Sequence, residues 1–467
     1  MEIKKGTPMD ERIKAALTEI VGPEGFTEAL IDLVSYATDA SEHSRRPLCA
    51  VWPTTTEQVA ALVRLANAEK IPLIPRGAGT GLSGMAVPHQ GGIVVDMARM
   101  NRIIEISIED RVAVVEPGVV YASLEKALAP HGFVFPPDPA SGKAATLGGN
   151  LATNAGGVKG AKYGTTKDYV LGLTVVLGDG QVMKTGTRAI KSSSGYDLTH
   201  LFVGSEGTLG IVTEIILKIA PKPPQAATAT AIFDDLADAG RAVTQIMSSG
   251  IIPSVLEILG RETIQAINQN TDLNLPEVDA MLLAETDGYT QAECEFQINK
   301  VIEVFRSNNA REVKRATDPD QVAELWKARK SCYPVLARLR PNFALEDITV
   351  PMSKVAAMLK GVQEIAARHK VQIATFGHAG DGNLHPQILY DAHDHDEKER
   401  VEAAAGDLFK LAISLGGTLT GEHGIGLSKA AYMTLEHDPV AMASMRAIKR
   451  LFDPNNILNP GKMALDA

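Results

Sequence analysis

Residues 76–84 read RGAGTGLSG, and they follow directly on a strand-like run, IPLIP, at 71–75. Glycines in such a loop permit positive φ and let several backbone N–H groups point into one concavity, which suits a phosphate. The loop lacks the closing GK[ST] of a nucleotide P-loop, and it is not a dinucleotide GxGxxG at the head of the chain. Taken alone, it indicates either a phosphate cradle or a plain turn after a strand.

Two further segments share this texture: PPDP at 136–139 followed by ATLGGNLATNAGG at 145–157, and GSEGTLGIV at 204–212. Glycine, threonine and asparagine alternate in them, so small hydrogen-bonding groups occur with almost no side-chain bulk. Three such loops in one region predict a cradle for a long polar ligand.

The pattern of predicted secondary structure changes at PKPP, residues 221–224. Before this point short β-like runs are separated by glycine, and LTVVL with QVMKT predicts a hairpin across residues 178–180. Beyond it, long helical patterns alternate with strands such as 281–285, 344–350 and 371–376. The expected helices are 9–37 with a break at Gly22 and Pro23, one capped by Thr54 and Glu57, and 235–248, 289–306, 318–338, 353–369, 396–415 and 439–452.

The second half also carries two histidine motifs, FGHAGDGNLHP at 376–386 and TGEHGIG at 420–426. A tight turn between two strands would bring His378 and His385 to the same end of neighbouring strands. With Glu422, two imidazoles and one carboxylate form a ligand set for catalytic Zn²⁺, Fe²⁺ or Mn²⁺. Spacing alone favours unrelated polar loop histidines over a metal site. His393 and His395 are expected on a solvated charged face.

Composition excludes several classes of protein. The 467 residues are 45% hydrophobic and 22% charged, the balance of a globular chain of several domains. A net charge of −10 argues against nucleic acids and anionic membranes as partners. Cys49, Cys294 and Cys332 form no CxxC pair, so we expect reduced structural thiols. A disulfide framework, a four-cysteine zinc site and an iron–sulfur cluster held by this chain alone are excluded.

Targeting signals are not expected. The start, MEIKKGTPMDERIKAAL, has no apolar core before Asp10 and Glu11, so it is not a signal peptide. The longest apolar run, which begins at Leu209, is broken by Glu214 and Lys218. A cytoplasmic protein is therefore expected.

Together these motifs resemble the FAD-binding fold of the vanillyl-alcohol oxidase/p-cresol methylhydroxylase superfamily. Within it, the chain is similar to the D-lactate dehydrogenase, glycolate oxidase and D-2-hydroxyglutarate dehydrogenase branch, from about Arg46 to Lys462. The resemblance implies an α+β protein: a two-part α/β FAD-binding domain of the p-cresol methylhydroxylase type, plus an α+β cap domain with an antiparallel sheet. The expected domains are N-terminal helices at 1–45, the FAD-binding domain at 46–222, the substrate and metal cap at 223–450, and a C-terminal segment at 451–467 that returns to the flavin domain.

The resemblance also implies how FAD is bound. The loop at 75–83 would wrap the pyrophosphate, and segments 137–164 and 206–212 would line the adenine and isoalloxazine. Many relatives tether the flavin through a histidine of the first loop; Thr80 holds that place here, so no covalent link through this loop is expected. The expected cofactor-binding residues are Pro75, Arg76, Gly77, Ala78, Gly79, Thr80, Gly81, Ser83, Pro137, Asp138, Thr146, Gly149, Asn150, Thr153, Asn154, Gly157, Gly164, Glu206, Gly210, Ile211, Val212 and Asn459.

For the chemistry, the resemblance implies a divalent metal (Zn, Fe or Mn) on His378, His385 and Glu422, with His423 as the base beside the flavin. Asp381 would be a turn residue or lie behind the ligands. Arg329, in LWKARK at 325–330, matches the family arginine that holds the substrate carboxylate. Further cations that a dicarboxylate would need are in range but not aligned: Arg338, Arg340 and Lys354.

The implied function is FAD-dependent oxidation of a short D-2-hydroxy acid, D-lactate first, to the 2-oxo acid. The hydroxyl would lose its proton with metal assistance, and the hydride would pass to flavin N5. Glycolate and D-2-hydroxyglutarate are alternative substrates. Two different classes of protein also fit: an electron-transfer subunit of a larger complex and a carbohydrate oxidase on the same fold. Electrons would leave to an electron-transferring flavoprotein, an iron–sulfur subunit, quinone or cytochrome, with the chain a homodimer or a complex subunit.

Overall fold

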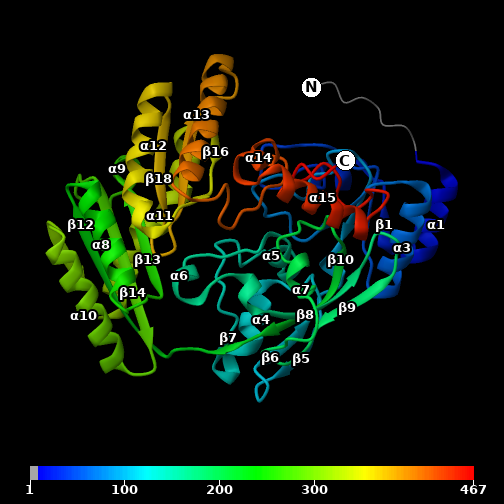
Figure 1. Ribbon diagram of the computed structural model, residues 1–467, viewed down its shortest axis with the longest axis horizontal. Helices are drawn as coiled ribbons and strands as arrows, with labels where there is room; N and C mark the ends of the chain where they lie inside the picture. Colours follow the sequence, from blue (N-terminus) through cyan, green and yellow to red (C-terminus); the bar gives the residue numbers. More distant parts are fainter. Residues whose placement is uncertain (1–8, 467) are drawn as a thin grey trace. The chain divides into compact units, whose positions relative to one another are not determined.

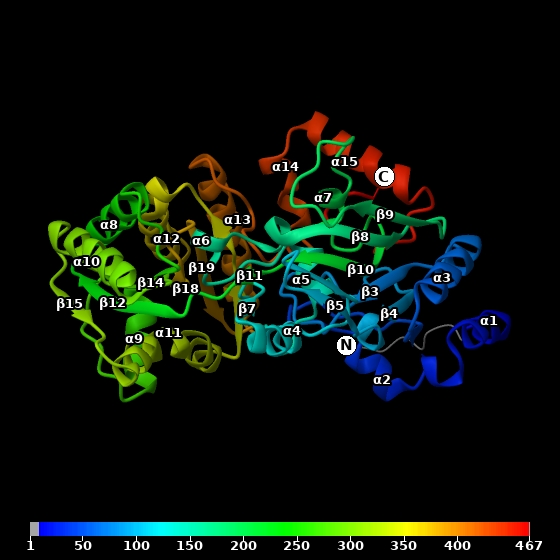
Figure 2. The ribbon, with the colours of Figure 1, turned by 90° about the horizontal axis from the view of Figure 1, so that it is seen from below.

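The computed structural model describes residues 9–466, which form two compact units (Figures 1 and 2). The first unit contains the described residues up to Ala155, Thr165–Pro221, and the chain from Glu422 onward. The second contains Gly156–Gly164 and Lys222–Gly421. The first eight residues lie outside the described part, and they include most of the segment before Asp10 that is expected not to be a signal peptide.

These units differ from the expected domains: the described residues before 46 belong to the first unit, and two further boundaries shift for reasons that local contacts give. Gly156–Gly164 joins the second unit because α6 (Gly160–Tyr163) is bound there: Tyr163 Oη donates to Asp287 Oδ2 at 2.6 Å. The chain returns to the first unit at Glu422 rather than near 450, because the following loop and α15 (Pro439–Phe452) bond to it.

The first unit begins with α1 (Glu11–Val21) and α2 (Leu30–Ser35), and its four-stranded sheet has the order β1-β2-β4-β3. These strands are β1 (Phe26–Thr27), β2 (Cys49–Val51), β4 (Ile93–Asp96) and β3 (Leu73–Arg76). Helix α3 (Thr56–Glu69) connects β2 to β3, both parallel to β4, and buries Val59, Leu62 and Val63 against the sheet. The helix cap differs by one residue from the expected Thr54: Thr55 accepts from the Gln58 N–H, while the Thr54 N–H donates to the Gln58 side chain.

A five-stranded antiparallel sheet follows in the same unit, in the order β5-β6-β10-β8-β9. Helices α4 (Tyr121–Leu128) and α5 (Leu147–Thr153) contribute Leu124 and Leu151 to its core. Strands β8 and β9 form the hairpin that the sequence predicts across residues 178–180. The strands are β5 (Ile103–Ser107), β6 (Val112–Val115), β10 (Ile211–Lys218), β8 (Val170–Val176) and β9 (Val182–Gly186), with a separate pair of β7 (Phe133–Val134) and β11 (Ala220–Pro221).

The second unit is an antiparallel sheet in the order β15-β12-β14-β13-β18-β19-β16, with β17 paired to β19. Its strands are β15 (Glu312–Arg315), β12 (Gln225–Phe233), β14 (Ala280–Gly288), β13 (Val255–Gly260), β18 (Gln372–His378), β19 (Asn383–Tyr390), β16 (Asn342–Leu345) and β17 (Ile348–Thr349). In Figure 2, α8 and α10 cover one face of β12 and β14, and α9 and α11 lie on the opposite face.

The helices of this unit are α8 (Leu236–Ser248), α9 (Arg261–Asn270), α10 (Gln291–Ser307), α11 (Pro319–Leu339), α12 (Val355–His369) and α13 (His395–Ser414). All of these except α9 match helices that the hydrophobic periodicity predicts. The expected fold class, an α/β flavin-type domain with an antiparallel α+β domain, is confirmed.

Two exclusions made from the sequence can also be compared with the structure. Cys49, Cys294 and Cys332 are all buried and free, as expected for structural thiols. Within residues 9–466, no helix has both the length and the apolar character needed to cross a membrane.

A buried ion pair fixes the last helix of the first unit. Lys449 of α15 pairs with Asp453 and donates to the carbonyl oxygens of Thr208 and Leu458, both at 2.8 Å. Asp453 in turn accepts from the Leu458 N–H at 2.7 Å. The side chains of the pair are only 3% and 0% exposed.

Lys449→Met should therefore destabilise the protein by about 3–5 kcal/mol, because Asp453 is left as an uncompensated buried charge. Arg188→Ala is the matched control, since Arg188 and Glu105 form an exposed pair (42% and 43%) worth no more than about 1 kcal/mol. Thermal unfolding of both variants measures the difference. Equal shifts in Tm would contradict the structural role of the buried pair.

Candidate functional site

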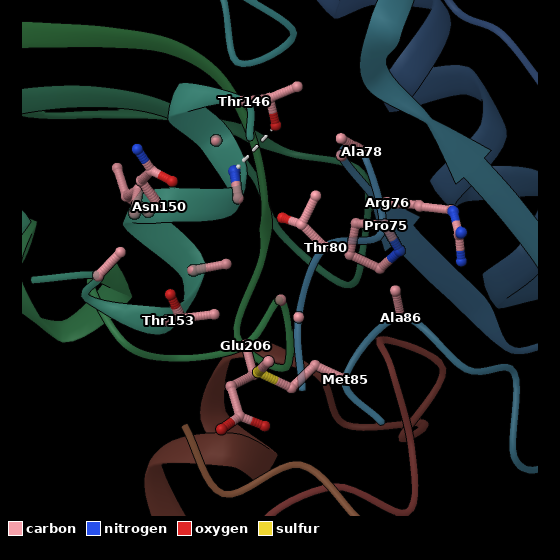
Figure 3. Close-up of a pocket in the computed structure, with 18 of the residues that line it drawn as sticks. Pro75, Arg76, Ala78, Thr80, Met85, Ala86, Thr146, Asn150, Thr153 and Glu206 are labelled. Carbon is pink, nitrogen blue, oxygen red and sulfur yellow. Dashed lines mark hydrogen bonds between the residues drawn. The ribbon is translucent and has the colours of Figure 1, made fainter. Parts of the chain in front are cut away.

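Three glycine-rich segments far apart in the sequence line one pocket of the first unit (Figure 3). They are residues 75–82, 146–155 and 205–212, with shorter contributions from elsewhere in the unit. The sequence-predicted cofactor residues that line this pocket are Pro75, Arg76, Gly77, Ala78, Gly79, Thr80, Gly81, Thr146, Gly149, Asn150, Thr153, Glu206, Gly210, Ile211 and Val212.

Other predicted residues stand behind the pocket wall. Ser83 Oγ donates to the Gly424 carbonyl at 3.0 Å. The Asn459 amide donates to the carbonyls of Met85 and Glu206, at 2.9 and 2.7 Å. These two residues therefore position wall segments rather than line the pocket. The predicted residues outside the lining are Ser83, Pro137, Asp138, Asn154, Gly157, Gly164 and Asn459, of which Gly157 and Gly164 belong to the second unit.

Close approach of two backbone segments explains why the first loop needs glycine. A Cβ on Gly77 would lie 2.2 Å from Thr146 Oγ1. Thr146 caps α5 by accepting from the Gly149 N–H at 3.2 Å, the contact drawn in Figure 3. The end of β3 and the start of α5 thus meet with no room for a side chain between them.

The pocket suits the flavin that the resemblance implies. Short side chains of Ala78, Thr80 and Thr153 face its interior in Figure 3, so an extended ligand can lie close to the backbone. The buried Asn150 Nδ2 has no hydrogen-bond partner among the described residues. An amide donor left unpaired inside a pocket is satisfied by an acceptor on the bound molecule.

Glu206 anchors the loop that carries Glu422 and His423. Its buried carboxylate accepts from the Ile425 N–H at 2.7 Å and the Gly426 N–H at 2.9 Å. Burial raises the pKa of Glu206 to about 7, although the two backbone N–H groups act in the opposite direction. Glu422 and His423 both line the same pocket as the glycine-rich loops, with His423 Nε2 3.8 Å from Glu422 Oε1.

In the second unit, the hairpin of β18 and β19 brings His378 and His385 together, as the sequence predicts. The register pairs His378 with Asn383 and Phe376 with His385. The two buried imidazoles have ring centroids 5.0 Å apart and planes at 86°. Asp381 stands in the connecting turn, where its carboxylate accepts from the Asn383 N–H at 3.2 Å.

Two buried carboxylates that the sequence reasoning missed lie behind these histidines. Glu257 of β13 contacts His378 Nδ1 at 2.5 Å. Asp347 lies 3.7 Å from His385 Nδ1 and accepts from Thr420 Oγ1 at 2.6 Å and the Gly421 N–H at 3.0 Å. The signal in the sequence was an acidic residue inside an apolar strand, as in VLEILG at 255–260.

Arg329 of α11 forms an ion pair with Glu257, so it reaches the same buried group as His378. Its guanidinium also lies 4.7 Å from the centre of the Phe376 ring. Burial alone would raise the pKa of Glu257, but the neighbouring charges of His378 and Arg329 and their hydrogen bonds lower it below the ordinary value.

The remaining candidates lie apart from this cluster. Arg340 pairs with Glu397, and Arg338 and Lys354 do not contact the histidines in any recorded hydrogen bond or ion pair of the described residues. His393 is 94% exposed and His395 lies at the start of α13, as expected for a solvated face.

Comparison with known proteins agrees with both units. Residues 47–186 match a family model described as FAD binding domain, and residues 222–463 match FAD linked oxidases, C-terminal domain. The chain is 42% identical to the glycolate oxidase subunit GlcD of Bacillus subtilis, covering 97% of this chain and 96% of that protein. It is 37% identical to a D-lactate dehydrogenase of Anaerostipes hadrus, covering 90% of each. A solved structure of p-cresol methylhydroxylase with substrate bound shares the fold, with a TM-score of 0.81 at 21% identity over 98% of this chain and 97% of that chain.

Gly77→Ala should weaken FAD binding about tenfold, because its Cβ meets Thr146 Oγ1 and overpacking of this kind costs about 1–3 kcal/mol. Fluorescence titration of the flavin-free protein with FAD measures the effect. Thr146→Ala alone is the control, since it removes the helix cap but leaves the loop in place.

In the double variant the obstructing oxygen is gone. Gly77→Ala should then add little to the loss caused by Thr146→Ala. If the two effects simply add, the contact between Gly77 and Thr146 does not control the loop.

Proposed function

The chain belongs to the FAD-linked oxidase family, and from this we propose that it oxidises a short D-2-hydroxy acid, D-lactate first, to the 2-oxo acid. The observation that carries the proposal is the position of His423, which lines the same pocket as the FAD-binding loops. A basic side chain at the flavin pocket is what removal of a hydroxyl proton requires.

Glycolate is the second candidate substrate. The relatives from Bacillus subtilis and Escherichia coli are named glycolate oxidase subunit GlcD, at 42% and 38% identity. Both acids present one carboxylate and one neighbouring hydroxyl, so the same residues would act on either.

We propose His378, His385 and Glu422 as ligands of a divalent metal (Zn, Fe or Mn), because two imidazoles and a carboxylate are a common set for such ions. When bound, FAD would accept the hydride and the metal would lower the pKa of the substrate hydroxyl. The buried carboxylate of Glu257 behind His378 supports this assignment, since metal-binding histidines usually donate to an acceptor through their other ring nitrogen. Glu422 directly follows Gly421, whose N–H is held by Asp347.

Separate residues of the chain would then bind the substrate, accept its proton and hold FAD. Arg329 holds the substrate carboxylate with its guanidinium, which keeps the reacting carbon in place. His423 takes the hydroxyl proton as the hydride leaves. Thr80 stands at the first loop where a tethering histidine would be needed, so FAD is held there without a covalent bond.

The electrons must leave the flavin to a separate acceptor. The three cysteines are buried singly and form no cluster that could carry them onward. We propose an electron-transferring flavoprotein, an iron–sulfur subunit, quinone or cytochrome as acceptor. The word "subunit" in the names of the GlcD relatives favours a partner subunit.

Anaerobic mixing with single substrates tests this function. D-lactate should bleach the flavin absorbance fastest, glycolate more slowly, and L-lactate and D-2-hydroxyglutarate least. Dialysis against a chelator should abolish the bleaching while the flavin spectrum persists, and a divalent ion should restore it. Full reduction in metal-free protein would remove the metal from the proposal, and preference for L-lactate would reverse the handedness.

Two variants separate binding from proton transfer. His423→Asn should slow flavin reduction at saturating substrate by on the order of 10²-fold or more, the usual size of a lost general base. Arg329→Ala should chiefly raise the apparent KM, because the carboxylate is held in both the ground and transition states. Pre-steady-state flavin reduction measures both. A wild-type rate for His423→Asn would place the base elsewhere, and an unchanged KM for Arg329→Ala would assign the carboxylate to another cation.

A further inference from the structure

Glu257 contacts two functional side chains of the second unit at once. Its Oε1 lies 2.5 Å from His378 Nδ1, and its Oε2 forms an ion pair with Arg329 Nε. The carboxylate is fully buried, on the strand next to β18. We propose that Glu257 is a shared positioning residue: it holds His378 in the form that binds a metal and holds Arg329 in the orientation that binds the substrate carboxylate. This inference rests on the proposed function.

The contact with His378 selects one tautomer of the imidazole. An ionised carboxylate only accepts hydrogen bonds, so His378 Nδ1 must carry a proton to bond with it. The neutral ring then has its lone pair on Nε2, the nitrogen that can bind a metal. In this way Glu257 decides which nitrogen of His378 is a ligand.

The backbone fixes this contact. Glu257 and His378 are direct partners in the register of β13 and β18, so their side chains emerge on the same face of the sheet. A shift of either strand by one residue would move that strand's own side chain of the pair to the opposite face. The pair is thus set by the sheet and not by a mobile loop.

The contact with Arg329 constrains the guanidinium from its inner side. Glu257 accepts from Nε, while the Phe376 ring lies 4.7 Å from the guanidinium carbon. One acceptor and one flat apolar surface define the plane of the group. Because the contact uses Nε, on one edge of the planar guanidinium, the N–H groups of the opposite edge point away from Glu257.

A second buried acid, Asp347, lies near His385, but the 3.7 Å between its Oδ1 and His385 Nδ1 is longer than a hydrogen bond. Asp347 accepts from Thr420 Oγ1 and from the Gly421 N–H, whereas Glu257 contacts both His378 and Arg329. Glu257 is therefore the acid whose loss should affect the metal and the substrate together.

Glu257→Gln tests the shared role in the full-length flavoprotein. An amide has one acceptor and one donor, so it cannot accept from both partners. If its oxygen serves Arg329, its NH₂ faces His378 Nδ1 and forces the proton to Nε2. If its oxygen serves His378, its NH₂ opposes the Arg329 N–H. Zn²⁺ titration by calorimetry should show binding weakened about 10–100-fold. At saturating Zn²⁺, the apparent KM for D-lactate should also rise several-fold.

Glu285→Gln is the matched control. Glu285 is a glutamate on the neighbouring strand, opposite Val255, and accepts from Thr228 instead of His378 or Arg329. Its Zn²⁺ affinity should equal that of the wild type. Arg329→Ala separates the two duties: it should raise the KM and leave Zn²⁺ affinity within about twofold, since Glu257 still faces His378.

A second measurement determines the tautomer in the wild-type protein itself. In metal-free wild-type protein labelled with ¹⁵N-histidine, long-range ¹H–¹⁵N spectra should show His378 protonated at Nδ1, with His378→Asn used only to assign the signal. Protonation at Nε2 would overturn the inference.

The outcomes distinguish this inference from the function on which it rests. If the wild type binds no Zn²⁺, the metal part of the proposed function fails and the inference falls with it. If the wild type binds Zn²⁺ and Glu257→Gln binds it equally well, the inference alone is wrong. If Glu257→Gln loses Zn²⁺ affinity but keeps its KM at saturating Zn²⁺, the shared role is overturned.

Discussion

The carboxylate of Glu206 holds the backbone N–H groups of Ile425 and Gly426, and the first unit depends on this contact. The chain leaves that unit at Pro221 and rejoins it at Glu422. The segment that begins at Glu422 must be held against the first unit. The buried Glu206 carboxylate does this by accepting hydrogen bonds from two backbone N–H groups of that segment. Glu206 also lines the pocket. The same residue therefore forms part of the pocket wall and positions the loop that carries His423.

Much of the fold could be predicted from local patterns. Helical periodicity predicts α8, α10, α11, α12 and α13, since each has an apolar stripe that only a helix would bury on one side. The hairpin of β8 and β9 follows from two β-rich runs around Gly178 and Gly180. The closeness of His378 and His385 was predictable for the same reason, because a short turn makes the two strands that it joins pair with each other. Local chemistry was enough wherever the two interacting segments are neighbours in sequence.

The rest of the candidate site depends on contacts between distant residues. Glu257 is 121 residues from His378, and the sequence around it reads as an ordinary buried strand. Nothing local distinguishes a glutamate that supports a histidine from one that forms a structural ion pair. The same holds for Glu206, which was expected to line the cofactor pocket but also anchors residues 219 and 220 positions away. The one-residue difference at the cap of α3 has another cause: Thr54, Thr55 and Thr56 are the same residue type, so the sequence does not show which of them accepts from the Gln58 N–H.

The buried acids also bear on the kind of chemistry that the second unit can support. An isolated carboxylate in a protein interior is costly, and removing its partner leaves that cost in place. The buried charge of Glu257 is stabilised by Arg329 and His378. Asp347 accepts from the Thr420 hydroxyl and the Gly421 N–H, and it also lies near the His385 imidazole. Both oxygens of Glu257 already contact these two partners, Arg329 and His378, so this acid orients side chains and does not accept a proton from a substrate. The base that we propose is a different residue, His423, which lines the pocket formed by the three glycine-rich segments.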